Sequence, residues 1–157
     1  GLDFGFAVDP LAFVQMHYDA KKEELYIFFD EVYQQKLTNR AVAQILRAKH
    51  LTAPIIADSA EPKSIAEIRD MGFNIIGCRK GPDSVAYGIK WLQERRKIYI
   101  DKRRCPNTYR EFTCYEYERN RQGQFISAYP DADNHAIDAV RYGMGGQSIR
   151  AKRSNIY

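Results

Sequence analysis

The segment Asp133-Asn-His-Ala-Ile-Asp-Ala-Val-Arg-Tyr-Gly143 places acidic and imidazole groups within a pattern that otherwise predicts a helix packed against a core. Residues three and four positions apart share one face of a helix. One polar stripe therefore contains His135, Asp138 and Tyr142. A separate apolar stripe contains Ile137, Val140 and Met144. The apolar stripe predicts that this helix packs against a core. Core packing alone does not explain the polar stripe.

Small and capping residues complete this segment. Ala136 and Ala139 are small enough to let the helix backbone approach a neighbouring element closely. Asp133 or Asn134 can cap the helix, because short polar side chains accept hydrogen bonds from the first free N–H groups. A capped amphipathic helix explains the segment as well as a functional helix does, so the rest of the chain has to decide between them.

Length and composition indicate a single globular domain. The chain has 157 residues, of which 45% are hydrophobic and 28% are charged, and these values are typical of folded proteins. The net charge of +4 permits a polyanionic partner without requiring one. No apolar run approaches the ~20 residues of a membrane span, and we expect no contact with a membrane. The chain starts without Met on a strand-like segment, which suggests a domain taken from a longer protein.

The cysteines argue against two kinds of site. Cys78, Cys105 and Cys114 are odd in number and contain no CxxC pair. A disulfide framework needs paired cysteines, and a structural zinc site needs closely spaced ligands. A reducing, cytosolic setting is the simplest explanation.

Hydrophobic patterns predict the order of the elements. Strands are expected at 1–8, 11–18 and 25–33, the last two joined as a hairpin. Helices beginning near Thr38 and Pro62 are expected to alternate with brief buried strands at 54–57 and 73–78. The remaining expected elements are a helix capped by Asp83 or Ser84, a strand at 97–100, a helical turn at 106–111, a hairpin pairing 113–119 with 125–128, and the helix quoted above.

This order predicts an α/β fold with a mixed sheet, in which three antiparallel strands are followed by parallel strands and helices cover both faces. Right-handed crossovers would place the strands that begin at Gly1, Pro54 and Phe73 side by side. We expect one domain over 1–147 and a frayed basic tail over 148–157.

Two acids occupy strand ends in this topology. Asp3 lies in an apolar strand, where an unpaired carboxylate is costly, unless it is exposed at the strand end. Asp58 lies at the carboxyl end of a parallel strand, where open α/β sheets place their sites, although an Asx turn also explains it. If the two strands are neighbours, both carboxylates emerge together and Asp138 can pack across them.

Three converging carboxylates would repel one another and favour a bound cation. Oxygen ligands without cysteine favour a hard ion such as Mg²⁺ or Mn²⁺. Two such ions about 3.5–4 Å apart stabilise the attacking and leaving oxygens of a phosphoryl displacement. The pattern therefore predicts phosphodiester hydrolysis.

Three motifs resemble the nuclease domain of the large terminase subunit of tailed bacteriophages. They are Gly1-Leu-Asp-Phe-Gly5, Ala57-Asp-Ser-Ala-Glu-Pro62 and the Asp133 segment, and the resemblance covers nearly the whole chain. It implies an RNase H-like fold and a metal-dependent endonuclease that cuts concatemeric double-stranded DNA during viral genome packaging. It also implies an N-terminal ATPase domain, portal and small terminase subunit partners, and the cytoplasm of the infected bacterial host. The chain itself contains no GxxxxGK[ST] phosphate loop, so we do not expect it to hydrolyse ATP alone.

The resemblance also assigns residues. By motif position, Asp3, Asp58 and Asp138 match the catalytic metal ligands of the family, and His135 is a candidate to orient a ligand or to bind the metal itself. Arg141 is a candidate to hold either a carboxylate or the DNA backbone. Several further side chains lie near the motifs, each with a turn, cap or solvent explanation: Asp9, Glu61, Lys63, Asp131 and Asp133.

Basic clusters are candidates for DNA contact, because phosphate contacts supply most of the non-specific affinity for DNA. The residues selected from these clusters are Lys80, Arg103, Arg104, Arg119 and Arg121. Tyr115 and Tyr117 lie close to Arg119, so the hairpin around them is a candidate flap beside the site.

Two other classes of function remain open. One is another RNase H-like enzyme, such as a junction resolvase or an integrase, which would use the same acids on a different DNA structure. The other is a non-catalytic DNA-binding module, in which the acids serve only as caps and turn residues.

Overall fold

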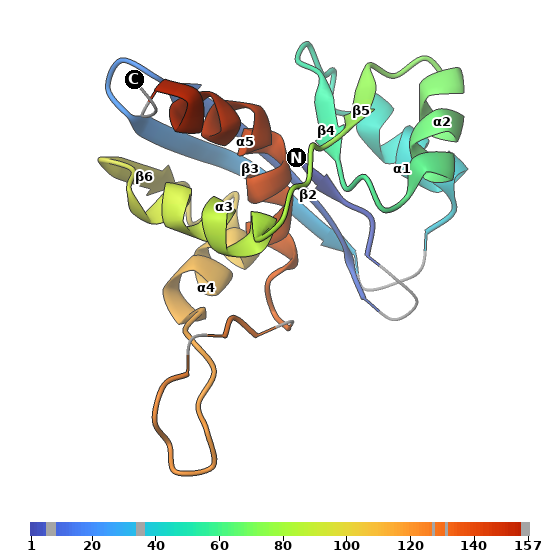
Figure 1. Ribbon diagram of the computed structural model, residues 1–157. Helices are drawn as coiled ribbons and strands as arrows, with labels where there is room; N and C mark the ends of the chain where they lie inside the picture. The colour runs from blue at the N-terminus through green and yellow to red at the C-terminus, as the bar shows by residue number, and fades with distance from the viewer. Residues whose placement is uncertain (6–8, 34–36, 127, 131, 155–157) are drawn as a thin grey trace.

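A computed structural model describes residues 1–5, 9–33, 37–126, 128–130 and 132–154 of the chain, with side chains as far as residue 146. A six-stranded sheet runs through it in the order β5-β4-β1-β2-β3-β6 (Figure 1). The strands are β1 (Leu2–Asp3), β2 (Leu11–Asp19), β3 (Glu24–Tyr33), β4 (Ile55–Ala57), β5 (Ile75–Gly77) and β6 (Lys97–Ile100). β2 pairs antiparallel with β1 and β3, whereas β1–β4, β4–β5 and β3–β6 are parallel.

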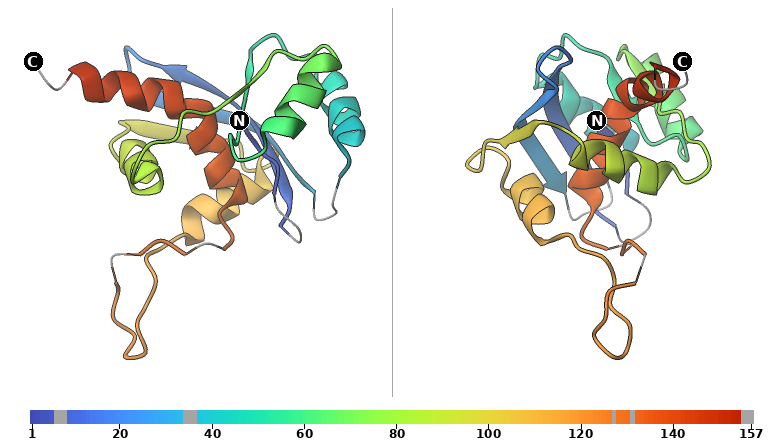
Figure 2. Two further views of the ribbon diagram at one scale, coloured as in Figure 1. Left: turned by 45° about the vertical axis from the view of Figure 1, so that its right-hand side comes forward. Right: turned by 60° about the vertical axis from the view of Figure 1, so that its left-hand side comes forward.

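Helices cover both faces of the sheet (Figure 2). They are α1 (Asn39–Arg47), α2 (Pro62–Asp70), α3 (Ser84–Gln93), α4 (Pro106–Cys114) and α5 (His135–Ser154). Alternate residues of β2 point to opposite faces, as the twofold period of a strand requires. Leu11 and Phe13 join the core under α1 and α2, and Ala12 and Val14 join the core under α3, α4 and α5.

The mixed sheet confirms the predicted fold class, and the strands at Gly1, Pro54 and Phe73 do lie side by side. Thr38 caps α1, since its hydroxyl oxygen accepts a hydrogen bond from the Ala41 N–H at 3.2 Å. Pro62 begins α2, where a missing N–H leaves no helical hydrogen bond unmade. Local patterning was therefore sufficient to find these elements.

Three details differ from the expectations. The turn expected at 106–111 is a complete helix, α4, whereas the hairpin expected beyond it does pair, through a bridge between Arg119 and Phe125 and a hydrogen bond from the Ile126 N–H to the Glu118 carbonyl at 2.8 Å. Asp83 occupies the N-cap of α3 with a φ of 58°, and its side chain makes no capping bond. The tail expected to fray continues α5 to Ser154, because residues 148–154 contain no proline and several strong helix formers. Residues 6–8 of the first expected strand lie outside the described part.

Candidate active site

Asp3 and Asp58 emerge from neighbouring strands at one edge of the sheet. Asp3 is the last residue of β1, and Asp58 directly follows β4. Leu2 pairs with Ala57, and the Asp58 N–H donates to the Leu2 carbonyl at 2.9 Å. Since β1 and β4 are parallel, their carboxyl ends, and the two acids with them, point the same way.

Helix α5 crosses this edge with its backbone against β1. A Cβ added to Gly1 would lie 1.7 Å from the Ala139 carbonyl oxygen, so the two backbones are in direct contact. Ala136 and Ala139 are both fully buried. The close approach expected from the two alanines is confirmed, and it places Asp138 beside the two strand ends.

Asp3 is held by a ring and by a backbone amide. Its Oδ2 lies 3.4 Å from His135 Nδ1, and its Oδ1 accepts the Gly5 N–H at 3.4 Å. Gly5 has a φ of 65°, and a Cβ there would lie 2.4 Å from the Asp9 carbonyl oxygen, so only glycine fits this turn. The hydrogen bond to the Asp3 carboxylate raises the pKa of His135, and this effect exceeds the opposing effect of burial.

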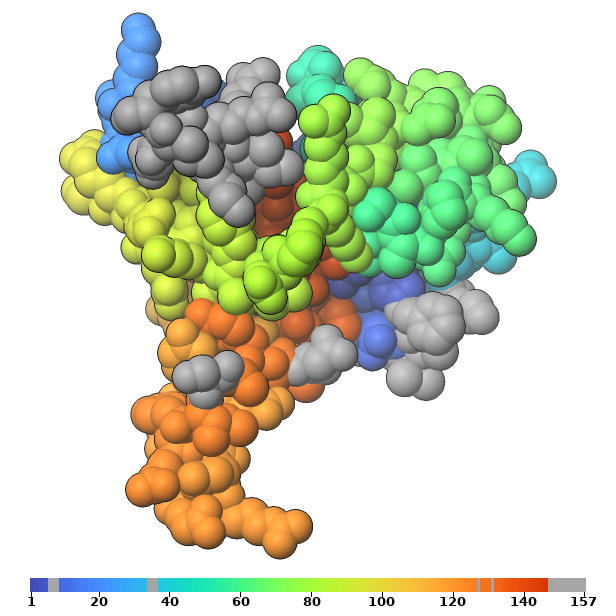
Figure 3. Space-filling model, viewed as in Figure 1, coloured from blue at the N-terminus to red at the C-terminus, as the bar shows by residue number. Residues whose placement is uncertain are grey.

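Asp58 has three partners. Its Oδ1 accepts the Ala60 N–H at 2.9 Å and also pairs with the Lys80 ammonium. Its Oδ2 accepts the Tyr142 hydroxyl at 3.3 Å. One face of this carboxylate is therefore occupied by a cation from the segment after β5, and the other by a side chain of α5. That segment crosses the front of the molecule, with α5 visible behind it (Figure 3).

Asp138 faces the interior rather than solvent, with 19% of its side chain exposed. Burial raises the pKa of the Asp138 carboxyl to about 6, and the Asp3 carboxylate adds to the rise against the opposing effect of Arg141. Arg141 Nε donates to Asp138 Oδ1 at 3.2 Å. Gly88 of α3 makes room for Arg141, since a Cβ on Gly88 would lie 3.1 Å from its Cδ. Of the two roles considered for Arg141, the structure shows the contact with a carboxylate.

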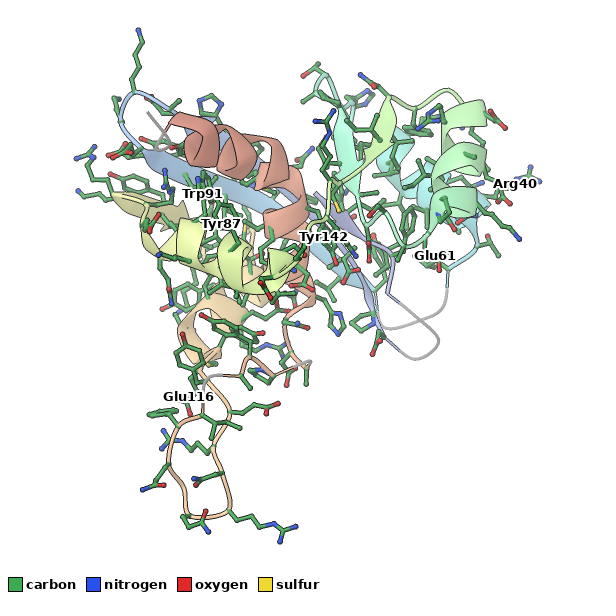
Figure 4. The ribbon with its side chains drawn as sticks, in the orientation of Figure 1. Arg40, Glu61, Tyr87, Trp91, Glu116 and Tyr142 are labelled. Carbon is green, nitrogen blue, oxygen red and sulfur yellow. The ribbon has the colours of Figure 1, made fainter. Side chains whose placement is uncertain are left out.

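Tyr142 of α5 lies where this helix passes the segment after β5 (Figure 4), and its hydroxyl donates to Asp58. Burial raises the pKa of its hydroxyl, and the charges of Asp138, Asp58 and Asp3 raise it further. All three carboxylates thus act on one hydroxyl. The polar stripe of α5 therefore faces the strand ends, as the spacing of His135, Asp138 and Tyr142 predicted.

Two buried acids that the sequence did not single out support this arrangement. Asp30 of β3 accepts the Thr108 N–H of α4 at 2.7 Å, and Glu111 of α4 accepts the Ile137 N–H of α5 at 2.9 Å. Each carboxylate meets the amino end of a helix, where free N–H groups and the helix dipole favour negative charge. The sheet thereby positions α4, and α4 positions the first turn of α5.

A cavity gives solvent access to Asp138. Its volume is about 560 Å³, and Ser84, Tyr115, Asn134 and Asp138 are among the residues that line it. A second cavity, of about 530 Å³, shares the start of α3 with the first and extends along the segment after β5. Asp138 is therefore partly buried but reached by a cavity.

The other acids near the motifs do not join the three. Asp133 is largely exposed and lies 3.7 Å from Arg110, and Glu61 accepts a hydrogen bond from the Ser64 hydroxyl at 3.3 Å. Asp9 contributes a smaller rise to the pKa of His135, which places it nearer the site. Lys63 is exposed on α2, and Asp131 lies outside the described residues.

The basic candidates separate into three regions. Lys80 lies at the acids. Arg104 instead lies over the Phe29 ring at 6.0 Å, and Arg103 is exposed in the same turn between β6 and α4. Arg119 stacks on Phe125 at 3.8 Å in the protruding hairpin, which also carries the exposed Arg121. Tyr115 and Tyr117 both stack on Tyr129. Of these cations, the structure brings only Lys80 into contact with an acid of the site.

Comparison with known proteins matches residues 3–145 to the family described as the terminase RNase H-like domain. The chain belongs to this family. The terminase large subunit of Bacillus phage SPP1 is 46% identical over 145 residues, which cover 90% of this chain and 34% of that protein. The PBSX phage terminase large subunit of Bacillus subtilis (strain 168) is 37% identical over 150 residues, covering 95% of this chain and 34% of that protein.

Solved structures agree with the family. The nuclease domain of the SPP1 large terminase, determined with bound Mn, superposes with a TM-score of 0.85 at 43% identity, covering 94% of this chain and 84% of that chain. The nuclease domain of the P22 large terminase shares the fold, with a TM-score of 0.66 at 16% identity over 93% of this chain and 78% of that chain. The chain is thus a large terminase nuclease domain with an RNase H-like fold, as the three sequence motifs indicated.

The chain spans about a third of the length of the curated relatives that it matches. In the described part of the chain, no helix is both long and apolar enough to cross a membrane.

Proposed function

We propose that this domain is a metal-dependent endonuclease that cleaves concatemeric double-stranded DNA during viral genome packaging. The observation that carries the proposal is the placement of Asp3 and Asp58 at the ends of two paired parallel strands, where His135 and Tyr142 of α5 contact Asp3 and Asp58, and Asp138 lies on the same face of that helix. The SPP1 nuclease domain, similar in sequence and structure, contains bound Mn. Both facts support a site for divalent ions at the carboxyl edge of β1 and β4.

The donor chemistry of the site fits Mg²⁺ or Mn²⁺. Asp138 is a partly buried carboxylate whose pKa is raised to about 6 mainly by desolvation and further by Asp3, and a cation would relieve the repulsion between the two acids. Within the described residues, no three acidic, His or Cys side chains are already gathered as one metal site. The acids are instead paired with His135, Lys80 and Arg141. Binding of a metal ion therefore requires these side chains to move away from the carboxylates. Asp3, Asp58 and Asp138 would hold the ions, with His135 beside Asp3.

Two bound ions would supply the nucleophilic hydroxide and stabilise the charge that develops on the attacking and leaving oxygens. The chain itself positions their ligands. Arg141 holds Asp138, Tyr142 orients Asp58, and His135 contacts Asp3, whose carboxylate raises the pKa of the imidazole. Basic side chains would bind the backbone phosphates; the candidates are Lys80, Arg103, Arg104, Arg119 and Arg121.

A plasmid-nicking assay with Mg²⁺ or Mn²⁺ tests the proposal. We expect cleavage that requires the ion and is lost in Asp3→Asn, Asp58→Asn and Asp138→Asn proteins that remain folded. Asp19→Asn is the matched control, since Asp19 accepts backbone hydrogen bonds from Lys21 and Lys22 in the turn between β2 and β3. Full activity in any one of the three site variants contradicts the three-acid site. A preference for branched over linear duplex would favour a junction resolvase instead.

The proposal extends to the longer protein. We infer that the domain works with an N-terminal ATPase domain of the same full-length chain, with a portal and a small terminase subunit, in the cytoplasm of the infected bacterial host. The length of the relatives supports a longer chain. A pull-down of the full-length protein with each partner tests this assembly, and failure to bind any of them contradicts it.

A further inference from the structure

Lys80 already places a positive charge on one of the acids assigned to the metal. Its ammonium pairs with Asp58 Oδ1 and lies 5.1 Å from the centre of the Tyr142 ring. The Tyr142 hydroxyl donates to the other oxygen of the same carboxylate. The position that a divalent ion would take against Asp58 is therefore held by a side chain of the protein.

The same lysine also lines a basic cavity. This cavity has a volume of about 530 Å³ and is lined by four cationic residues, Arg79, Lys80, Lys90 and Arg141, and by one acid, Asp83. Ser84 adds a hydroxyl at the start of α3. Several cations and a hydroxyl around one space suit an oxyanion, and a phosphodiester of the DNA backbone is such a group.

We propose that Lys80 alternates between two anions, pairing with Asp58 when the site holds no metal and with a DNA backbone phosphate in this cavity when a divalent ion occupies Asp58. This inference rests on the proposed metal site. Lysine suits the exchange because its ammonium is a point charge on a flexible four-carbon stem. With 38% of its side chain exposed, Lys80 can leave Asp58 while remaining solvated.

Two consequences follow from charge. An ammonium and a divalent ion compete for one carboxylate, so Lys80 weakens metal binding in the absence of DNA. Once displaced, Lys80 is free to bind the phosphate, so metal increases the affinity for DNA. Linkage requires DNA to increase the affinity for metal by the same factor. A Lys80 that bound only DNA would strengthen DNA binding without weakening metal binding.

Isothermal titration with Mn²⁺ in the absence of DNA tests the competition. We expect Lys80→Met to bind Mn²⁺ about 5-fold more tightly or better, the low end of typical couplings between sites. Arg79→Met removes a neighbouring positive charge of the same cavity. We expect a smaller increase in Mn²⁺ affinity in this variant, which measures the effect of losing a nearby charge that does not contact Asp58. Lys49→Met controls for a broken ion pair, because Lys49 contacts Glu31 at 2.5 Å and lies 4.4 Å from the Phe29 ring.

Fluorescence anisotropy measures duplex DNA binding with and without Ca²⁺. It tests whether Lys80 pairs with a DNA phosphate once a divalent ion occupies Asp58. Gels run afterwards verify that the DNA is uncut. We expect Ca²⁺ to tighten DNA binding by the wild-type protein about 5-fold or more, and to have little effect on Lys80→Met. Lys80→Arg keeps the charge and retains part of the coupling.

The outcomes separate the two proposals. Unchanged or weaker Mn²⁺ binding by folded Lys80→Met overturns the exchange, as does wild-type Ca²⁺ coupling in that variant. If Lys80→Met does not fold, Lys80→Gln takes its place under the same criteria. Wild-type Mn²⁺ binding by Asp58→Asn instead overturns the metal site itself. Loss of Mn²⁺ binding in Asp58→Asn, with no tightening in Lys80→Met, leaves the nuclease proposal standing and removes only the exchange.

Discussion

Glu111 makes the stability of this domain depend on pH in a way that one substitution can isolate. Its side chain is 3% exposed, and burial raises the pKa of the carboxyl from 4.5 to about 7, against the opposing effect of the Ile137 and Ala136 backbone N–H groups. In the unfolded chain the ordinary value applies. The folded state therefore binds the proton more tightly, and protonation favours folding.

The sign and size follow from these two values. The contribution is fully present below pH 4.5 and is lost as pH rises through about 7. A difference of about 2.5 between the pKa values corresponds to roughly 3 kcal/mol, at 1.36 kcal/mol per unit. Glu111→Gln keeps the shape and an acceptor for the Ile137 N–H but carries no charge. We expect the variant to gain roughly 3 kcal/mol of stability relative to wild type between pH 4.5 and pH 8.

Urea unfolding measures this difference, with the fluorescence of Trp91 as the probe, since it is the single tryptophan and is buried in the core. Titrations at several pH values give the free energy of unfolding of both proteins. Glu116→Gln removes an exposed glutamate near the start of the hairpin and controls for the loss of one negative charge. A difference between Glu111→Gln and wild type that stays constant within about 0.5 kcal/mol over this range would refute the reasoning.

Two further substitutions test how the site is supported. Asp30→Ala leaves the Thr108 N–H at the start of α4 without its acceptor, and we expect a loss of about 1–3 kcal/mol by urea unfolding; a stability equal to wild type would show that water replaces the carboxylate without cost. Ala139→Leu forces a larger side chain into a fully buried position of α5, and we expect a loss of about 1–3 kcal/mol or more; a thermal midpoint at or above that of wild type would contradict the tight contact with β1 at Gly1.

Local patterns account for most of the agreement between sequence and structure. The enrichment of 11–18 and 25–33 in Phe, Val, Tyr and Ile predicted β2 and β3 within a residue or two, and Thr38 and Pro62 marked the starts of two helices. These signals are local, because the type of a strand or helix follows from residues that are close together in the sequence. The prediction failed where the signal was weak, as at α4, whose aromatic and polar residues have little helical periodicity.

For the candidate site, too, some features were predictable from the sequence and others were not. Asp3, Asp58 and Asp138 were candidates from motif and position alone, and the crossover rule placed β1 beside β4. The partners of these acids were not predictable, because they depend on which distant elements pack together. Tyr142 and Asp58 are 84 residues apart, and Asp30 and Thr108 are 78 apart. The burial of Glu111, which sets its pKa, is likewise a property of the assembled core.

The sequence by itself determined the order of the elements and the class of fold, since periodicity and topology rules act along the chain, and its motifs named the three acids as candidates. Only the tertiary structure decided that Lys80 pairs with Asp58, that Arg141 holds Asp138 and that two buried carboxylates anchor the helices leading to the site. The physical reason is that charges act through space. A side chain acquires its partner and its pKa from the elements that fold around it, and those elements are separated along the chain.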